Sequence, residues 1–217
     1  NQETAKVGSI CGIAGMFLAL VVTFGANTEM AYLWAGAAIA AGSVIGVVAA
    51  IRVAMTALPE LVAMLHSFVG LAAVLVGFST FMAESQHASG VLLVEIYVDV
   101  AIGAVTFTGS IIAWGKLSGK MSGNPLLIPG RHVVNALMVI GLVGLAVPYV
   151  DFVQQPGMTS LYMLGANATI ASLLGIHLVV AIGGADMPVV VSLLNSYSGW
   201  AAAAAGFMLS NDLLTIT

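Results

Sequence analysis

Two polar side chains, His66 and Asn195, lie inside long apolar runs and could together handle a proton. A histidine binds and releases a proton near neutral pH. An asparagine amide can hydrogen-bond to a neutral imidazole or to a water beside it. Polar groups inside a membrane are costly and therefore point to function. The pair indicates one station of a proton relay, and the alternative is that each residue makes its own hydrogen bond between helices.

The two residues are expected at similar depths in a membrane. His66 lies seven residues after Pro59, and Asn195 lies seven residues after Pro188. Both prolines are suited to the first turn of a helix, where no backbone N–H is needed. At a rise of about 1.5 Å per residue, both side chains lie roughly 10 Å from the same side of the membrane.

Three further ionisable residues occur in apolar runs. Glu95 and Asp99 are four residues apart, so they share one face of the helix expected over 91–114. They could collect protons at the membrane surface, but we expect them to face the aqueous mouth as interfacial charges. We expect His177 to have a structural role.

Asp186 lies in the short turn 183–188, between two apolar runs. Aspartate is favoured just before a helix, where its charge complements the helix dipole, so this residue could cap the helix that follows. Alternatively, it could contact a soluble partner. Arg131, His132 and the loop 116–120 are expected on the same surface.

The elements that hold these residues follow from the composition. The 217 residues include only five basic and nine acidic side chains, and 60% are hydrophobic. A soluble domain carries about a quarter charged residues. The mean hydropathy is +1.10. A chain that cannot cover its outside with charge needs an apolar solvent, so the composition predicts an integral membrane protein and excludes a soluble globular protein, a disordered chain and a nucleic-acid binder.

The expected fold class is an all-α, polytopic transmembrane helix bundle, with residues 1–217 forming a single transmembrane domain. Lipid offers no partners to backbone groups, so helices are favoured, and a span needs about 20 apolar residues. About seven runs meet this length. They are 7–24, 31–51, 59–81, 91–114, 132–150, 159–182 and 188–209.

The basic residues predict the orientation of the bundle. If the N-terminus lies inside, all of them fall on the inner side, as the positive-inside rule requires. They are Lys6, Arg52, Lys116, Lys120 and Arg131.

Small residues four apart indicate where helices could approach closely. Gly8 with Gly12, and Gly42 with Gly46, have this spacing. The alternative is that small residues are simply common in membrane helices.

Motifs for nucleotides and metals are missing from the sequence. We find no glycine-rich dinucleotide fingerprint, no Walker loop and no paired cysteines, since Cys11 is the only cysteine. We therefore expect neither a bound cofactor nor a metal in this chain.

Five segments together carry a resemblance to a known family: PELVAMLHSFVG at 59–70, GAVTFTGS at 103–110, PGRH at 129–132, GGADMP at 183–188 and LNSYSGW at 194–200. They resemble the membrane domain (domain II) of the beta subunit of proton-translocating NAD(P)+ transhydrogenase. The resemblance extends over nearly the whole chain.

This resemblance implies an enzyme that passes hydride from NADH to NADP+ while a proton moves inward. It implies that His66 is the central protonatable group, that Asn195 lines the same channel, and that Asp186 belongs to an inner loop communicating with an NADP(H)-binding domain. NAD(H) and NADP(H) would bind to soluble domains outside this chain. The implied partners are an alpha subunit, or an equivalent NAD(H)-binding domain with its membrane helices, and a second copy of the full unit. A further span and the NADP(H)-binding domain are expected beyond residue 217, in a bacterial or mitochondrial inner membrane.

Two other functions remain open at this point. A proton-coupled secondary transporter would use the same histidine but would need a substrate cavity built from broken helices. A structural membrane anchor would use His66 and Asn195 only for helix packing.

Overall fold

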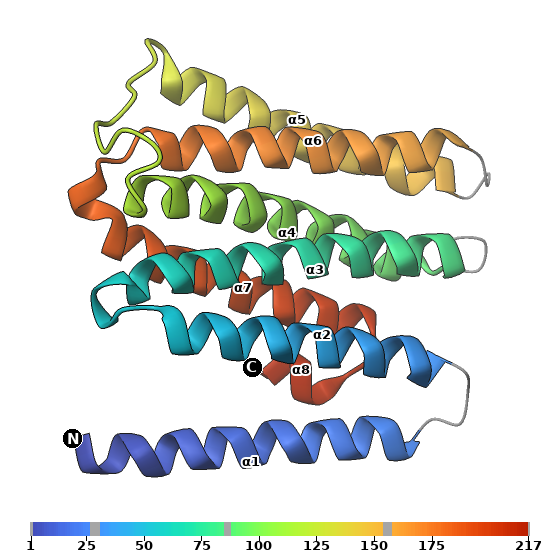
Figure 1. Ribbon diagram of the computed structural model, residues 1–217. Coiled ribbons are helices and arrows are strands. Elements are labelled where there is room, and N and C mark those ends of the chain that lie inside the picture. Colours follow the sequence, from blue (N-terminus) through green and yellow to red (C-terminus); the bar gives the residue numbers. More distant parts are fainter. Residues whose placement is uncertain (1, 27–30, 85–87, 154–157, 217) are drawn as a thin grey trace. The chain divides into compact units, whose positions relative to one another are not determined.

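The computed structural model describes residues 2–26, 31–84, 88–153 and 158–216. All regular elements in these ranges are helices, which confirms the predicted all-α fold class (Figure 1). The chain divides into two compact units, Asn1–Val53 and Ala54–Thr217. Each unit is described by itself below.

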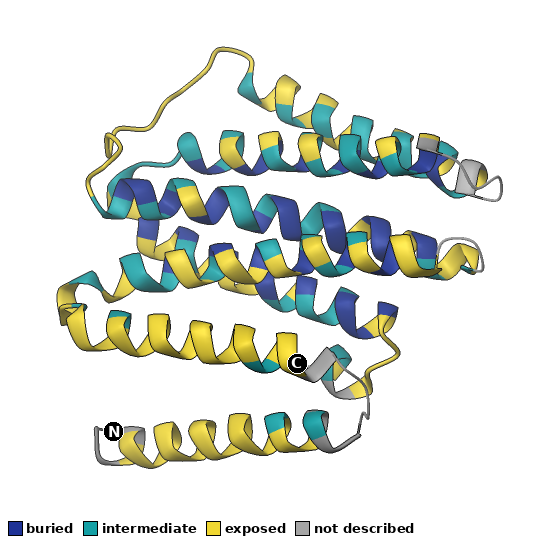
Figure 2. Ribbon diagram, turned by 45° about the vertical axis from the view of Figure 1, so that its right-hand side comes forward, coloured by how far each residue is buried: buried dark blue, intermediate teal, exposed yellow. Residues whose placement is uncertain are grey.

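The first unit contains two long helices, α1 (Gln2–Ala26) and α2 (Ala31–Arg52). Every side chain in them whose exposure is described is exposed or half-buried (Figure 2). Both helices are apolar around their whole circumference, a pattern that suits lipid or a surrounding protein rather than water.

The second unit is built around α4, which packs against α3, α5, α6 and α7. In Figure 1, α4 lies between α3 and α6. Short 3-10 turns precede α3 and α7. The elements are η1 (Met55–Ala57), α3 (Leu58–Glu84), α4 (Gly90–Leu117), α5 (Arg131–Val153), α6 (Met158–Val180), η2 (Gly184–Asp186), α7 (Met187–Met208) and α8 (Asp212–Ile216).

Glycines set how closely α3, α4 and α6 approach one another. A Cβ atom on Gly70 would lie 2.5 Å from the backbone nitrogen of Phe107, and one on Gly103 would lie 2.9 Å from the carbonyl oxygen of Gly70. On α6, a Cβ atom on Gly175 would lie 2.5 Å from the carbonyl oxygen of Val105. Any larger residue at these positions would push the helices apart.

The glycine pairs singled out by their spacing do not form such contacts. A Cβ atom added at Gly8, Gly12, Gly42 or Gly46 would meet no atom within 4 Å. Within its own unit, the described structure therefore favours the alternative, that small residues are simply common in membrane helices. Spacing alone is insufficient because a matching helix face must lie opposite.

Within the described ranges, five helical stretches are long and apolar enough to cross a membrane. The two other predicted spans correspond to α1 and α7. The apolar part of α1, Lys6–Val22, is shorter, and the middle of α7 carries Asn195 among several serines. The helices are those of a membrane helix bundle, while the count of seven spans and the inner N-terminus stay predictions. The five stretches are Leu33–Arg52, Met55–Glu84, Gly90–Leu117, Arg131–Asp151 and Thr159–Val180.

Candidate functional site

His66 lies on α3 with its ring half-buried. Its Nε2 atom is fully buried and has no hydrogen-bond partner in the protein. Buried polar atoms are nearly always hydrogen-bonded, so an exception requires an explanation. An imidazole nitrogen that no protein group occupies can bind or release a proton.

Asn195 lies on α7, a helix that packs against α3. It directly follows Leu194, which is buried in one cluster with Ala63 of α3 and Ala113 of α4. Since His66 is one turn after Ala63, this cluster brings the two polar residues to a similar level of the bundle. Asn195 is exposed in this chain, and the described contacts include no hydrogen bond between it and His66. Their direct pairing stays a prediction.

The carboxylates of α4 differ from one another in their surroundings. Glu95 is half-buried, whereas Asp99 is 0% exposed, and neither of its oxygens has a hydrogen-bond partner in the protein. The expectation that both residues face water is therefore wrong for Asp99. The reason is the close approach of α3, where a Cβ atom on Gly77 would lie 3.4 Å from Oδ2 of Asp99.

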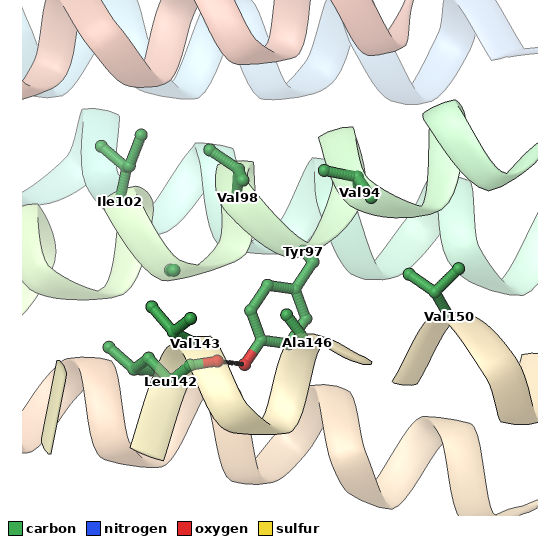
Figure 3. Close-up of a pocket in the computed structure, with 9 residues that line it drawn as sticks. Val94, Tyr97, Val98, Ile102, Leu142, Val143, Ala146 and Val150 are labelled. Atoms are coloured by element: carbon green, nitrogen blue, oxygen red, sulfur yellow. Dashed lines mark hydrogen bonds between the residues drawn. The ribbon is translucent and has the colours of Figure 1, made fainter. Parts of the chain in front are cut away.

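A second set of buried polar groups joins α4 to α5 and α6. Nδ2 of Asn167 donates to the carbonyl oxygen of Tyr97 at 2.9 Å. The hydroxyl of Tyr97 donates to the carbonyl oxygen of Leu142 at 2.7 Å (Figure 3). These bonds lie beside an apolar cavity of about 240 Å³ between α4 and α5. The sequence interpretation missed Asn167, although an amide inside an apolar run is the same signal that identified Asn195.

Lys116 is buried at the end of α4 rather than exposed on a surface. Its Nζ atom donates to the carbonyl oxygen of Val180 at 2.7 Å and to that of Ile182 at 2.5 Å. A positive charge at this place complements the C-terminal end of the α6 dipole. Lys116 is therefore not exposed in the way expected for the surface loop 116–120, because α6 ends directly against this side chain, while its location on the inner side stays a prediction.

Backbone hydrogen bonds join the loop between α4 and α5 to the turn between α6 and α7. The N–H of Gly184 donates to the carbonyl oxygen of Gly123 at 2.7 Å, and the N–H of Leu126 donates to that of Val180 at 3.1 Å. Together with Lys116, these bonds make the loop and the turn one connected surface.

Asp186 is exposed at the end of this turn and directly precedes α7. Its side chain makes no capping hydrogen bond to α7, so the structure does not support the interpretation of this residue as a helix cap. The contact of this exposed carboxylate with a soluble partner stays a prediction. At the start of α5, Nε of Arg131 donates to Nε2 of His132 at 3.3 Å.

His177 has a partner, unlike His66. Its Nδ1 atom hydrogen-bonds to Oδ1 of Asn135, which links α6 to α5. This bond supports the structural role expected for His177.

Comparisons with known proteins agree on one family. The family described as NAD(P) transhydrogenase beta subunit matches residues 1–217. An NAD(P) transhydrogenase subunit beta from Rhodospirillum rubrum is 44% identical over 223 aligned residues, covering 100% of this chain and 47% of the relative. A second subunit beta sequence, from a defined strain of the same species, has the same identity and coverage. The chain thus spans about half the length of the curated relatives that it matches.

Proposed function

Because this chain belongs to the NAD(P) transhydrogenase beta-subunit family, we propose that it is the membrane part of a proton-translocating transhydrogenase. The complete enzyme passes hydride from NADH to NADP+ while a proton moves inward across the membrane. One observation carries this proposal. The Nε2 atom of His66 is buried without a protein partner, and His66 lies at the level of Asn195.

His66 is the group that takes up the transferred proton. In the neutral ring one nitrogen donates and the other accepts, whereas both donate in the protonated ring. Asn195, on the neighbouring helix α7, can respond through either end of its amide, directly or through water. Protonation therefore changes the hydrogen bonding between α3 and α7.

The change reaches the inner surface through α7, which begins directly after Asp186. Asp186 contacts the NADP(H)-binding domain, and Lys116 with the loop between α4 and α5 holds the turn in place. The coupling must be reciprocal: if protonation alters nucleotide binding, nucleotide binding alters the proton affinity of His66. Moving one proton across 100 mV supplies about 2.3 kcal/mol, which shifts a two-state equilibrium about fifty-fold.

The remaining parts of the enzyme supply the nucleotide chemistry. Soluble domains bind NAD(H) and NADP(H), and this chain binds neither. The partners are an alpha subunit with its own membrane helices and a second copy of the full unit. The setting is the inner membrane of a bacterium or of a mitochondrion.

The test is a His66→Ala substitution in the complete enzyme, reconstituted into lipid vesicles. With nucleotides added outside the vesicles, the reverse hydride transfer from NADPH to NAD+ drives protons into the lumen. We expect this uptake to fall by about a hundredfold or more, because a positioned acid–base group contributes at least that much. A pH-sensitive dye inside the vesicles measures the uptake. The matched control is His177→Gln, which keeps a side-chain hydrogen-bonding group near Asn135 and should leave uptake unchanged. Proton uptake that remains fully coupled in His66→Ala would overturn the proposal.

A further inference from the structure

Asp99 is the one carboxylate of the described second unit with both oxygens buried and without a hydrogen-bond partner in the protein. Burying an ionised carboxylate without a partner is far more costly than burying a neutral carboxylic acid. In membrane helices such residues are rare and typically serve ion or proton pathways. The burial of Asp99 without a partner therefore indicates a functional role.

Among the described residues of its unit, no lysine or arginine is placed to neutralise Asp99. The basic residues of its unit, Lys116, Lys120 and Arg131, lie at or beyond the opposite end of α4. Lys116 donates to carbonyl oxygens there, and Lys120 lies over the ring of Trp114. Without a cation, a proton is the simplest means of neutralising the carboxylate.

The other titratable groups near Asp99 also leave it unpaired. Glu95 is half-buried one turn earlier on α4. Tyr97 donates to a carbonyl oxygen of α5, and Tyr149 of α5 packs against the ring of Tyr97 at 5.2 Å between centroids. On α3, Glu84 is exposed, seven residues beyond Gly77.

The helix α7 offers no charge near Asp99. Its residue Ala205 is buried in one cluster with Ile96 and Val100, the neighbours of Asp99 on α4. In the described structure, Gly77 of α3 thus lies against the carboxyl group, and the apolar cluster around its α4 neighbours contains no charged side chain.

The register of α3 against α4 relates Asp99 to His66. Gly70 lies against Gly103 and Phe107, and Gly77 lies against Val100 and Asp99. Since the two helices run in opposite directions, His66, one turn before Gly70, lies beyond Phe107 on the side away from Asp99. Asp99 and His66 therefore occupy opposite halves of one helix pair, and the predicted orientation makes the half with Asp99 the outer one.

Hydroxyl groups lie along α4 between these two levels. Thr106 and Ser110 are seven and eleven residues after Asp99, offsets that keep all three on one face of a helix. All three are 0% exposed. Oγ1 of Thr106 donates to the carbonyl oxygen of Ile102, while Oγ of Ser110 has no partner in the protein. A buried polar row thus runs along α4 towards the level of His66.

We infer that Asp99 is a second proton-binding site of this chain, in the outer half of the interface between α3 and α4, and that it exchanges protons with His66. The inference rests on the proposed function of His66. Binding forms one O–H bond on the carboxylate and release breaks it, so no electron is transferred.

The test compares Asp99→Asn and Asp99→Glu in the complete enzyme in lipid vesicles. Asparagine has the shape of a protonated aspartate but cannot release a proton. We expect proton uptake to fall by at least about tenfold in Asp99→Asn and to be partly retained in Asp99→Glu. Glu84→Gln, an exposed acid at the outer end of α3, is the matched control and should be unchanged.

Infrared difference spectroscopy gives a second measurement that does not require activity. The wild-type enzyme should show a carbonyl band of a protonated carboxylic acid that is lost in Asp99→Asn and shifted in Asp99→Glu. If the Asp99→Asn enzyme does not assemble, the shift of the carbonyl band in Asp99→Glu is sufficient to test the inference. Identical spectra in that variant, or unchanged proton uptake in Asp99→Asn, would overturn the inference.

The outcomes separate this inference from the proposed function. If wild-type vesicles transfer hydride without proton uptake, the proposed function fails, and the inference fails with it. If the wild type and Asp99→Asn take up protons equally while His66→Ala does not, only the assignment of Asp99 fails.

Discussion

Helix α2 of the first unit and helix α3 of the second are both apolar and both carry glycines, yet only α3 has a buried face. Every described side chain of α2 is exposed or half-buried, whereas α3 buries a stripe from Ala63 to Phe81. A Cβ atom at Gly42 of α2 would meet nothing, but at Gly70 of α3 it would collide with α4. In an apolar solvent hydrophobicity gives little drive for helix association, so burial depends on a complementary partner surface.

The largest expected difference between α3 and α2 comes from adding a bulky side chain at a glycine. We expect Gly70→Leu to destabilise the protein by about 3 kcal/mol, because α3 and α4 must separate to admit the side chain. Gly42→Leu in the first unit should leave the stability nearly unchanged. Unfolding of the complete protein in mixed detergent measures both. Equal losses of stability in the two variants would show that α2 is as tightly packed as α3.

Removing a charged side chain tests the same difference between the two units, with Lys116 as the buried lysine. Lys116→Met leaves the carbonyl oxygens of Val180 and Ile182 without their charged donor. We expect a loss of about 2 kcal/mol in the free energy of unfolding, measured in the same detergent system. The control is Lys6→Met on α1, an exposed lysine whose loss should have no effect. A stable Lys116→Met protein would mean that the turn before α7 is held by its backbone bonds alone.

The smallest expected effect concerns a buried amide. Asn167→Leu removes the hydrogen bond to the carbonyl oxygen of Tyr97, and hydrogen bonds between membrane helices contribute about 1 kcal/mol or less. The substitution also removes the buried, unpartnered Oδ1 atom, which offsets part of the loss. Ser43→Ala, on the exposed surface of α2, is the control. A loss as large as that of Lys116→Met would show that Asn167 organises more than one contact.

Much of the fold was predictable because an apolar run of about 20 residues in lipid can satisfy its backbone only as a helix. The run predicted over 59–81 is α3, Leu58–Glu84, and the run predicted over 188–209 is α7, Met187–Met208. The resemblance found in the segments around His66 and Asn195 is confirmed by the family that matches the chain.

The surroundings of individual charges could not be predicted in the same way. Asp99 was expected to face water and Lys116 to belong to a surface loop, and both are buried. Position along a helix gives the depth of a residue, but the side of the helix that is covered depends on its neighbours. Those neighbours are determined by contacts distant in sequence, such as Gly77 against Asp99 and Lys116 against Val180.

The amino-acid sequence alone was sufficient to predict a membrane environment and the helices. It was also sufficient to identify His66 as the candidate proton-binding residue. Each of these predictions depends on local composition and spacing. Tertiary packing decided which polar atoms lack partners. It left Nε2 of His66 and both oxygens of Asp99 buried and unpaired, while Asn135 bonded His177. The physical reason is that a polar atom in a membrane acquires its role from the atoms that neighbouring helices bring to it, and the pairing of those helices is not local.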